Sequence, residues 1–198
     1  MFSLLYGFYE YLTHKEEVHI LVIGLDRAGK TRLLDRIRLL FTGLSTLENG
    51  HTLPTVGLNI ARFDLKNVPL VFWDLGGQAQ LRSIWEKYYG ESHALVFVVD
   101  ASDHARLAEA KGVLEKLMGN AELQGAPLLV LANKQDLPGA MAAVEVRDRM
   151  GLSRFSRERA VDVRPCSAVN GEGLEDATSW LAGEVKHSRR ADSLRKKR

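Results

Sequence analysis

One eight-residue pattern constrains this chain more than any other feature. It follows the rule G-x-x-x-x-G-K-S/T and consists of Gly24, Leu25, Asp26, Arg27, Ala28, Gly29, Lys30 and Thr31. An apolar run of strand length precedes it and an amphipathic helical pattern follows it. In such a loop the backbone N–H groups surround the phosphate oxygens, and the N-terminus of the following helix adds the positive end of its dipole. The lysine reaches the terminal phosphates, and the threonine hydroxyl faces Mg²⁺. The pattern therefore predicts that all eight residues bind a nucleoside triphosphate, and its strand-before, helix-after context disfavours a chance glycine turn.

Length and composition fit one domain with short extensions. The chain has 198 residues, of which 45% are hydrophobic and 26% are charged, and this is enough apolar material for one core of ordinary size. The single cysteine, Cys166, excludes an intramolecular disulfide and a multi-cysteine zinc site, and we expect it to serve packing in a reducing compartment. No apolar run reaches the length of a membrane span.

Apolar runs of strand length alternate with helical periodicity. The runs typical of strands buried on both faces are 18–23, 68–73, 94–99 and 127–132, with a shorter candidate at 161–164. Helical stripes separate or follow them. Only Lys66 and Asn67 separate the run 58–65 from the run 68–73, which is too short for a crossover and predicts an antiparallel hairpin at the sheet edge. The predicted fold class is α/β, doubly wound, with a mostly parallel six-stranded sheet, one antiparallel edge strand and helices on both faces.

Polar residues follow the run that ends at Trp73. In this topology ligands lie at the carboxyl ends of the strands. An acid there, Asp74, can hold Mg²⁺, usually through water, and Gly77 lets a backbone N–H approach the last phosphate. Gln78 is placed to orient an attacking water. Taken singly, Asp74 also fits a strand-end cap and Gln78 an exposed loop residue, but their spacing from the glycine-rich loop favours the functional interpretation.

A second group of polar residues predicts which base is bound. Asn133, Lys134 and Asp136 follow the run 127–132. A carboxylate accepts two hydrogen bonds from the ring N–H and amino group of guanine, a donor pair that adenine lacks, so Asp136 would select GTP and GDP. The aliphatic part of Lys134 can lie along the purine face. After the candidate strand 161–164, Ser167 and Ala168 form a further candidate, in which the Ala168 N–H would meet the guanine carbonyl.

Together these motifs resemble the small GTPases of the ADP-ribosylation factor family. The resemblance covers about residues 1–186 and implies the P-loop GTPase fold. It rests on the segments 24–31, 54–57, 73–78 and 133–136. Within the family the chain is most similar to a Golgi branch, with which it shares a long stretch between Thr31 and Thr55, a leucine at Leu58 and no glycine after Met1.

The resemblance implies a timed switch with GTP, GDP and Mg²⁺ as ligands. Thr31 and Thr55 would be the Mg²⁺ ligands, Thr55 only while the terminal phosphate is present. Lys30 and Gln78 would be the catalytic residues, with slow hydrolysis until an activating protein supplies an arginine. Arg32 replaces a threonine usual after the loop, yet its backbone N–H can still bind phosphate. An apolar triad, Leu58, Trp73 and Tyr88, would bind effector proteins, and a guanine nucleotide exchange factor would reload the site.

The two ends of the chain provide the basis for predicting how the protein attaches to membranes. Residues 1–16 read as an amphipathic helix, residues 17–186 as the GTPase domain, and residues 187–198 as a basic disordered tail. Phe2 stands where N-myristoylation requires a glycine, so acetylation of Met1 and a membrane-protein receptor are the expected attachment determinants. We expect a monomer on the cytosolic face of Golgi membranes that exchanges with the cytosol and binds no nucleic acid, because no aromatic residues interleave with the basic tail.

Two other functions remain open at this stage. A P-loop kinase or ATPase is disfavoured by Asn133, Lys134 and Asp136, and equal displacement by ATP and GTP would favour it. A nucleotide-binding scaffold with negligible hydrolysis is disfavoured by Gln78, and single-turnover hydrolysis with an activating protein discriminates it.

Overall fold

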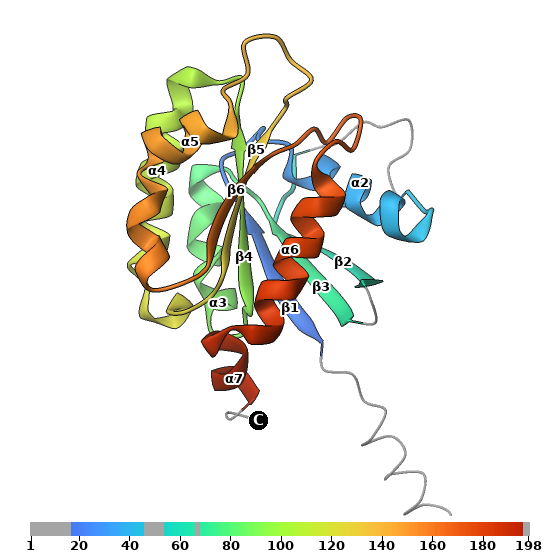
Figure 1. The fold of residues 1–198 in the computed structure, drawn as a ribbon, viewed down its shortest axis with the longest axis vertical. Coiled ribbons are helices and arrows are strands. Elements are labelled where there is room, and N and C mark those ends of the chain that lie inside the picture. The colour runs from blue at the N-terminus through green and yellow to red at the C-terminus, as the bar shows by residue number, and fades with distance from the viewer. Residues whose placement is uncertain (1–16, 46–53, 66–67, 196–198) are drawn as a thin grey trace, which may run out of the picture.

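The computed structural model describes residues 17–45, 54–65 and 68–195 as a three-layer α/β domain (Figure 1). Its six-stranded sheet has the order β2-β3-β1-β4-β5-β6. The strands are β1 (Val18–Ile23), β2 (Leu58–Leu65), β3 (Val68–Leu75), β4 (Ala94–Asp100), β5 (Leu128–Asn133) and β6 (Val161–Pro165). All neighbouring pairs are parallel except β2 and β3, which form the predicted antiparallel edge hairpin. The predicted fold class is confirmed.

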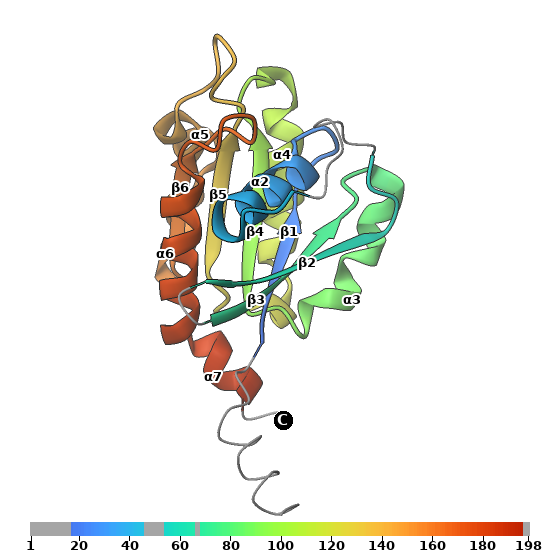
Figure 2. The ribbon, with the colours of Figure 1, turned by 90° about the vertical axis from the view of Figure 1, so that its right-hand side faces the viewer.

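Helices cover both faces of the sheet because alternate strand residues point to opposite sides. Along β1, Ile20 and Val22 pack in one apolar cluster, and Leu21 and Ile23 pack in the other. The helices α2 (Lys30–Thr42) and α6 (Leu174–His187) lie on one face, and α3 (Glu86–Tyr89), α4 (Leu107–Met118) and α5 (Ala143–Met150) on the other (Figures 1 and 2). The strands β1, β3, β4 and β5 are therefore largely buried on both sides, as their continuous apolar runs indicate, whereas the edge strand β6 is only partly buried.

Short 3₁₀ turns connect several of these elements. They are η2 (Ala79–Ile84), η3 (His104–Arg106), η4 (Ala121–Leu123) and η5 (Leu152–Arg157). The η2 turn follows directly after Gln78, and the η3 turn leads into α4. Both turns border the carboxyl edge of the sheet, where the polar strand-end residues gather.

The end of the chain differs from the expected disordered tail. A further helix, α7 (Arg189–Arg195), packs at the opposite end of the domain from the glycine-rich loop (Figure 1). Ser188 caps it by accepting a hydrogen bond from Ala191 N at 3.0 Å, and Arg190 is only 7% exposed. This helix was not predicted from the sequence, because a short segment rich in arginine resembles a solvated tail. The predicted N-terminal helix, 1–16, lies outside the described residues.

Among the described residues, no helix has both the length and the apolar character needed to cross a bilayer.

Candidate functional site

The glycine-rich loop, residues 24–31 and here called the P-loop, joins β1 to α2 in a conformation that requires glycine. Gly24 has a φ of 143°, and a Cβ added there would lie 2.3 Å from Val98 O. Gly29 has a φ of 90°, and its Cβ would lie 2.5 Å from Asn133 Nδ2. Arg27 adopts a φ of 62° without being glycine, and its side chain is exposed. The loop is therefore held tightly against β4 and β5 while its backbone curves around the cavity.

Lys30 begins α2 and is buried beneath this loop. Its Nζ donates to Leu25 O at 2.8 Å and to Gly24 O at 3.1 Å. Burial lowers the pKa of Lys30 to about 8, although Asp74 and Asp26 oppose the shift. The ammonium thus lies at the cavity floor, where an anionic ligand would stabilise its charge.

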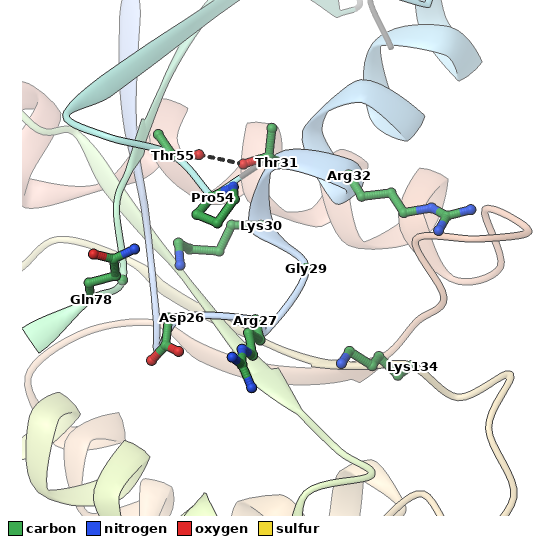
Figure 3. Close-up of a pocket in the computed structure, with 11 residues that line it drawn as sticks. Asp26, Arg27, Gly29, Lys30, Thr31, Arg32, Pro54, Thr55, Gln78 and Lys134 are labelled. Carbon is green, nitrogen blue, oxygen red and sulfur yellow. Dashed lines mark hydrogen bonds between the residues drawn. The ribbon is translucent and has the colours of Figure 1, made fainter. Parts of the chain in front are cut away.

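Thr31, Thr55 and Asp74 meet at one point beside Lys30. The hydroxyls of Thr31 and Thr55 lie 2.8 Å apart, and Thr31 Oγ1 donates to Asp74 Oδ2 at 2.7 Å (Figure 3 shows the threonine pair). Burial raises the pKa of the Asp74 carboxyl, and the hydrogen bond from Thr31 and the charge of Lys30 oppose that shift. The three oxygens come from β3, α2 and the segment before β2. Their proximity cannot be recognised from the positions of these residues in the sequence.

This oxygen cluster fits Mg²⁺. Asp74 is 0% exposed, and its Oδ1 has no hydrogen-bond partner of normal geometry among the described residues. A buried carboxylate oxygen without a partner is costly unless a cation or water satisfies it. Hydroxyl and carboxylate oxygens are hard ligands that suit Mg²⁺, which also keeps water and phosphate oxygens in its shell.

The segment after β3 closes over the P-loop. A Cβ added to Gly77 would lie 2.4 Å from Leu25 C and 2.5 Å from Asp26 N, so only glycine allows this approach. Gln78 follows with an extended backbone and precedes the η2 turn. We call residues 76–78 the Gln78 loop.

A cavity of about 510 Å³ separates these segments. Its walls come from the P-loop, from Pro54 and Thr55, from Gly77 and Gln78, and from Lys134 (Figure 3). Arg32 also lines it from α2. A volume of this size suits a small-molecule ligand.

The Asn133–Asp136 group extends from this cavity. Asn133 is buried and donates from Nδ2 to Ala28 O at 2.8 Å, which ties β5 to the P-loop. Lys134 has a φ of 70° and pairs with Asp100 Oδ2 at 2.5 Å. Asp136 is exposed and accepts from Ser167 Oγ at 2.6 Å. Its carboxylate is therefore accessible at the end of the site.

The structure gives Ala168 a different partner from the one expected. Its N–H donates to Asn133 Oδ1 at 3.0 Å. The hydrogen bond joins the loop after β6 to β5. Asn133 therefore ties three segments together through Ala28 and Ala168.

The predicted effector triad lies away from the cavity, on the side of β2 and β3. The Trp73 and Tyr88 rings lie 5.2 Å apart, and Trp73 also stacks on His19 at 4.5 Å. Leu58 and Tyr88 are partly buried against the same apolar cluster.

Sequence reasoning missed the partners of Asp26 and Lys134. Asp26 pairs with Arg106, which lies 80 positions further along the chain, and Lys134 pairs with Asp100. No short motif marks such long-range ion pairs, although Asp100 directly follows the predicted strand 94–99 and could have been included among the strand-end carboxylates.

The fold and the cavity together define the class of P-loop GTPases, because a glycine-rich P-loop, an oxygen cluster that fits Mg²⁺ and an Asn-Lys-x-Asp group share one sheet edge. The ADP-ribosylation factor family model matches residues 5–185, and the chain belongs to this family. It is a GTP-binding switch protein and a GTPase, and proteins of this kind work with exchange factors, activating proteins and effectors.

Individual relatives agree with this assignment. The chain is 39% identical to human (Homo sapiens) ADP-ribosylation factor-related protein 1 over 184 residues, which is 91% of each chain. It is 38% identical to the same protein of Bos taurus over 184 residues, again 91% of each. A solved structure of the Arl6 BBS3 small GTPase from Trypanosoma brucei, with bound nucleotide analogue GppNp, is similar with a TM-score of 0.77 and 28% identity, covering 87% of this chain and 99% of that one.

Proposed function

We propose that this protein is a Mg²⁺-dependent guanine-nucleotide switch that regulates membrane traffic at the Golgi. The observation that carries the proposal is the 2.8 Å contact between the Thr31 and Thr55 hydroxyls beside buried Asp74. It brings a residue of the segment before β2 to the phosphate-binding loop, which is the contact a loop needs in order to sense the terminal phosphate.

The metal site would consist of Thr31 and Thr55, with Asp74 acting through water. These residues would hold Mg²⁺, and the bound ion would supply positive charge that offsets the negative charge developing during phosphoryl transfer. Thr31 lies at the start of α2, whereas Thr55 lies in the irregular segment before β2. This difference makes Thr55 the ligand that responds to hydrolysis.

The remaining phosphate contacts would come from the P-loop, Lys30 and Gly77. Lys30 would exchange its bonds to Leu25 O and Gly24 O for the β- and γ-phosphates, whose negative charge would stabilise the ammonium. The Gly77 N–H would bind the γ-phosphate, and Gln78 would orient the attacking water. The reaction depends on positioning and charge stabilisation, and an arginine from an activating protein would supply part of that stabilisation. Hydrolysis by the isolated protein should therefore be slow, and this arginine would add about 10³ to 10⁵ in rate.

Asp136 would select guanine. Its accessible carboxylate, steadied by Ser167, can accept from the ring N–H and amino group together. Asn133 would hold the loops around the base, and the stem of Lys134 would cover the purine face.

Calorimetry with Mg²⁺ tests the nucleotide assignment directly. Wild-type protein should bind GTP and GDP at least about a hundredfold more tightly than ATP, because the wrong base leaves polar groups unpaired. Asp136→Asn should lose this preference and gain affinity for xanthosine nucleotides, whose carbonyl can accept from the asparagine amide. Equal affinity of the wild-type protein for adenosine and guanosine nucleotides would reject the proposal.

The Golgi assignment is supported by the resemblance of the chain to the Golgi branch of its family. Effectors would bind at Leu58, Trp73 and Tyr88, and attachment would require the N-terminal segment and a membrane-protein receptor. Imaging of the tagged full chain should show Golgi membranes for wild type and a cytosolic distribution for Thr31→Asn. A cytosolic distribution for both proteins would reject the membrane part of the proposal.

A further inference from the structure

A chain of ion pairs runs outside the nucleotide cavity, from the P-loop to the Gln78 loop. Asp26 Oδ1 pairs with Arg106 Nη2 at 2.7 Å, and Asp26 O accepts from Arg106 Nη1 at 3.2 Å. Arg106 Nε pairs with Glu109 Oε2 at 3.0 Å, and Glu109 Oε1 pairs with Arg82 Nη2 at 2.8 Å. Arg82 Nε then donates to Gly77 O at 3.0 Å.

The two ends of this chain meet. Gly77 lies against the backbone of Leu25 and Asp26, so closely that a Cβ would have 2.4 Å to Leu25 C. The ion pairs therefore close a ring around the contact between the two loops, and Glu109 on α4 joins its two arginines. We call Asp26, Arg106, Glu109 and Arg82 the ion-pair clamp.

Asp26 makes the clamp relevant to the reaction. It lines the cavity that would hold the polyphosphate, where an uncompensated carboxylate repels phosphate oxygens. In Figure 3 its carboxylate points away from the hydroxyls of Thr31 and Thr55. The hydrogen bond from Arg106 lowers the pKa of Asp26, which keeps the carboxylate ionised and paired.

The η3 turn holds Arg106 in place. Its backbone N–H donates to Asp103 Oδ1 at 3.2 Å, which caps the η3 turn that leads into α4. Glu109 lies in the first turn of that helix, where the helix dipole favours a negative charge. The middle of the clamp thus belongs to η3 and α4, and its ends reach the P-loop and the Gln78 loop.

We propose that Arg106, Glu109 and Arg82 are positioning residues for GTP hydrolysis: Arg106 holds the Asp26 carboxylate away from the polyphosphate, and Arg82 fixes the Gly77 carbonyl so that Gln78 faces the attacking water. The proposal rests on the proposed placement of nucleotide and Gln78. None of these three side chains would touch the nucleotide, and they would act through Asp26 and Gln78.

Exposure sets the size of the expected effect. The Glu109 side chain is 43% exposed and that of Arg82 is 19% exposed, so each pair is moderately screened by solvent and salt. Losing the Glu109 carboxylate should slow hydrolysis about two- to fivefold at low salt.

The main test compares Glu109→Gln with Glu115→Gln. Glu115 lies on the same helix, is 41% exposed and pairs with Arg154 at 2.5 Å, but it contacts neither loop. Single-turnover hydrolysis of GTP with Mg²⁺ is measured at about 50 and 500 mM salt, together with dissociation of a fluorescent GDP analogue. We expect only Glu109→Gln to slow hydrolysis, with GDP dissociation unchanged, and we expect the difference from wild type to vanish at high salt. Equal rates for the two variants at low salt overturn the proposal.

A second test asks whether the positive charge at position 106 compensates the Asp26 carboxylate. Arg106→Gln should accelerate GDP dissociation roughly five- to tenfold because Asp26 loses its partner. Arg106→Lys, which keeps the charge, should restore slow dissociation but not fast hydrolysis, since one ammonium does not serve Asp26 and Glu109 in the same way as a guanidinium. Dissociation that is equally fast in Arg106→Lys and Arg106→Gln contradicts the proposal.

These tests distinguish failure of the clamp from failure of the proposed function. If the wild-type protein binds guanine nucleotides without preference or does not hydrolyse GTP, the proposed function fails. If wild type hydrolyses GTP and Glu109→Gln matches it at low salt, only the clamp fails. Circular dichroism and thermal unfolding of Glu109→Gln and Glu115→Gln confirm equal folding, because both substitutions are isosteric and exposed.

Discussion

Gly77 packs directly against the backbone of the P-loop. Backbone atoms of Leu25 and Asp26 leave no room for a methyl group at Gly77. The glycine is therefore required for packing as well as for its expected contact with the terminal phosphate. One atom added here must push apart the two loops that enclose the reaction.

Gly77→Ala should consequently impair both stability and activity. We expect a loss of about 1 to 3 kcal/mol in the free energy of unfolding, as for overpacked sites, because backbone atoms cannot yield as a flexible side chain would. Single-turnover hydrolysis should fall at least about tenfold, since Gln78 moves with its neighbour. Denaturant unfolding and a phosphate-release assay measure the two effects.

Gly112 offers the matched control for this substitution. It lies within α4, and a Cβ there meets nothing within 4 Å. Gly112→Ala should raise the free energy of unfolding by about 0.5 to 1 kcal/mol through helix propensity and leave hydrolysis unchanged. A Gly77→Ala protein as stable and as active as Gly112→Ala would show that the two loops separate freely.

At the scale of elements, the sequence predicts the strands better than the short helices. The runs 18–23 and 58–65 coincide with β1 and β2, and the two-residue connection at Lys66 and Asn67 explains why β2 and β3 pair antiparallel. A strand buried on both faces needs a continuous apolar run, so its signal is strong and local.

The helices α5 and α7 are not predicted from the sequence, and the reason is physical. Each is short, with eight and seven residues, and its apolar stripe consists of few side chains. Such helices form because of tertiary contacts, which periodicity does not contain. The same reasoning applies to the ion-pair clamp, whose partners are fixed by the meeting of η3 and the P-loop.

Arg190 is the tertiary contact that holds α7. Its guanidinium donates to Tyr89 O at 2.7 Å, Gly90 O at 2.8 Å and Ser92 O at 3.0 Å. These carbonyls end α3 and the turn after it, and a cation at a helix C-terminus also interacts favourably with the dipole. Burial lowers the pKa of Arg190, and the charge of Glu122 opposes the shift.

Arg190→Met should therefore release α7 from the domain. We expect the free energy of unfolding to fall by about 2 to 3 kcal/mol, because a buried multiple hydrogen bond is lost and its acceptors remain. Arg189→Met, one position earlier and exposed, should change it by less than about 0.5 kcal/mol. Denaturant unfolding with hydrogen exchange at Ala191 checks both effects, and equal stability of the two variants would contradict the anchoring role.

At the scale of the whole molecule, the site is assembled from segments spread along most of the chain. The P-loop, Thr55, the Gln78 loop and Lys134 line one cavity, and Asn133 links the P-loop to the segment after β6. The sequence predicted these groups because each motif is local and the fold brings strand ends together. The cross-links between motifs, such as Asn133 to Ala168, needed the structure.

Cys166 lies beneath these cross-links and can report when the whole site opens. The side chain is 1% exposed, and its Sγ lies 3.8 Å from Asn133 Oδ1. Burial raises the pKa of the Cys166 thiol to about 12, with Asp136 adding to the shift. Because the folded pKa exceeds the ordinary value of 9.0, the protonated thiol contributes stability below that pH, and the contribution is lost as the pH rises toward 12.

Alkylation at pH 8 should therefore require opening of the fold around β5 and β6. Native protein should react slowly with iodoacetamide, whereas denatured protein should react at the rate of a free cysteine, because only a thiolate attacks and only an accessible one is reached. Guanine nucleotide with Mg²⁺ should slow labelling further, by a factor that grows with ligand concentration as mass action requires, since the ligand binds only the closed form. ATP at the same concentration serves as the control and should have little effect. Mass spectrometry follows the single adduct, and labelling that is fast in native protein, or equally slowed by both nucleotides, would mean that β6 opens independently of the guanine site.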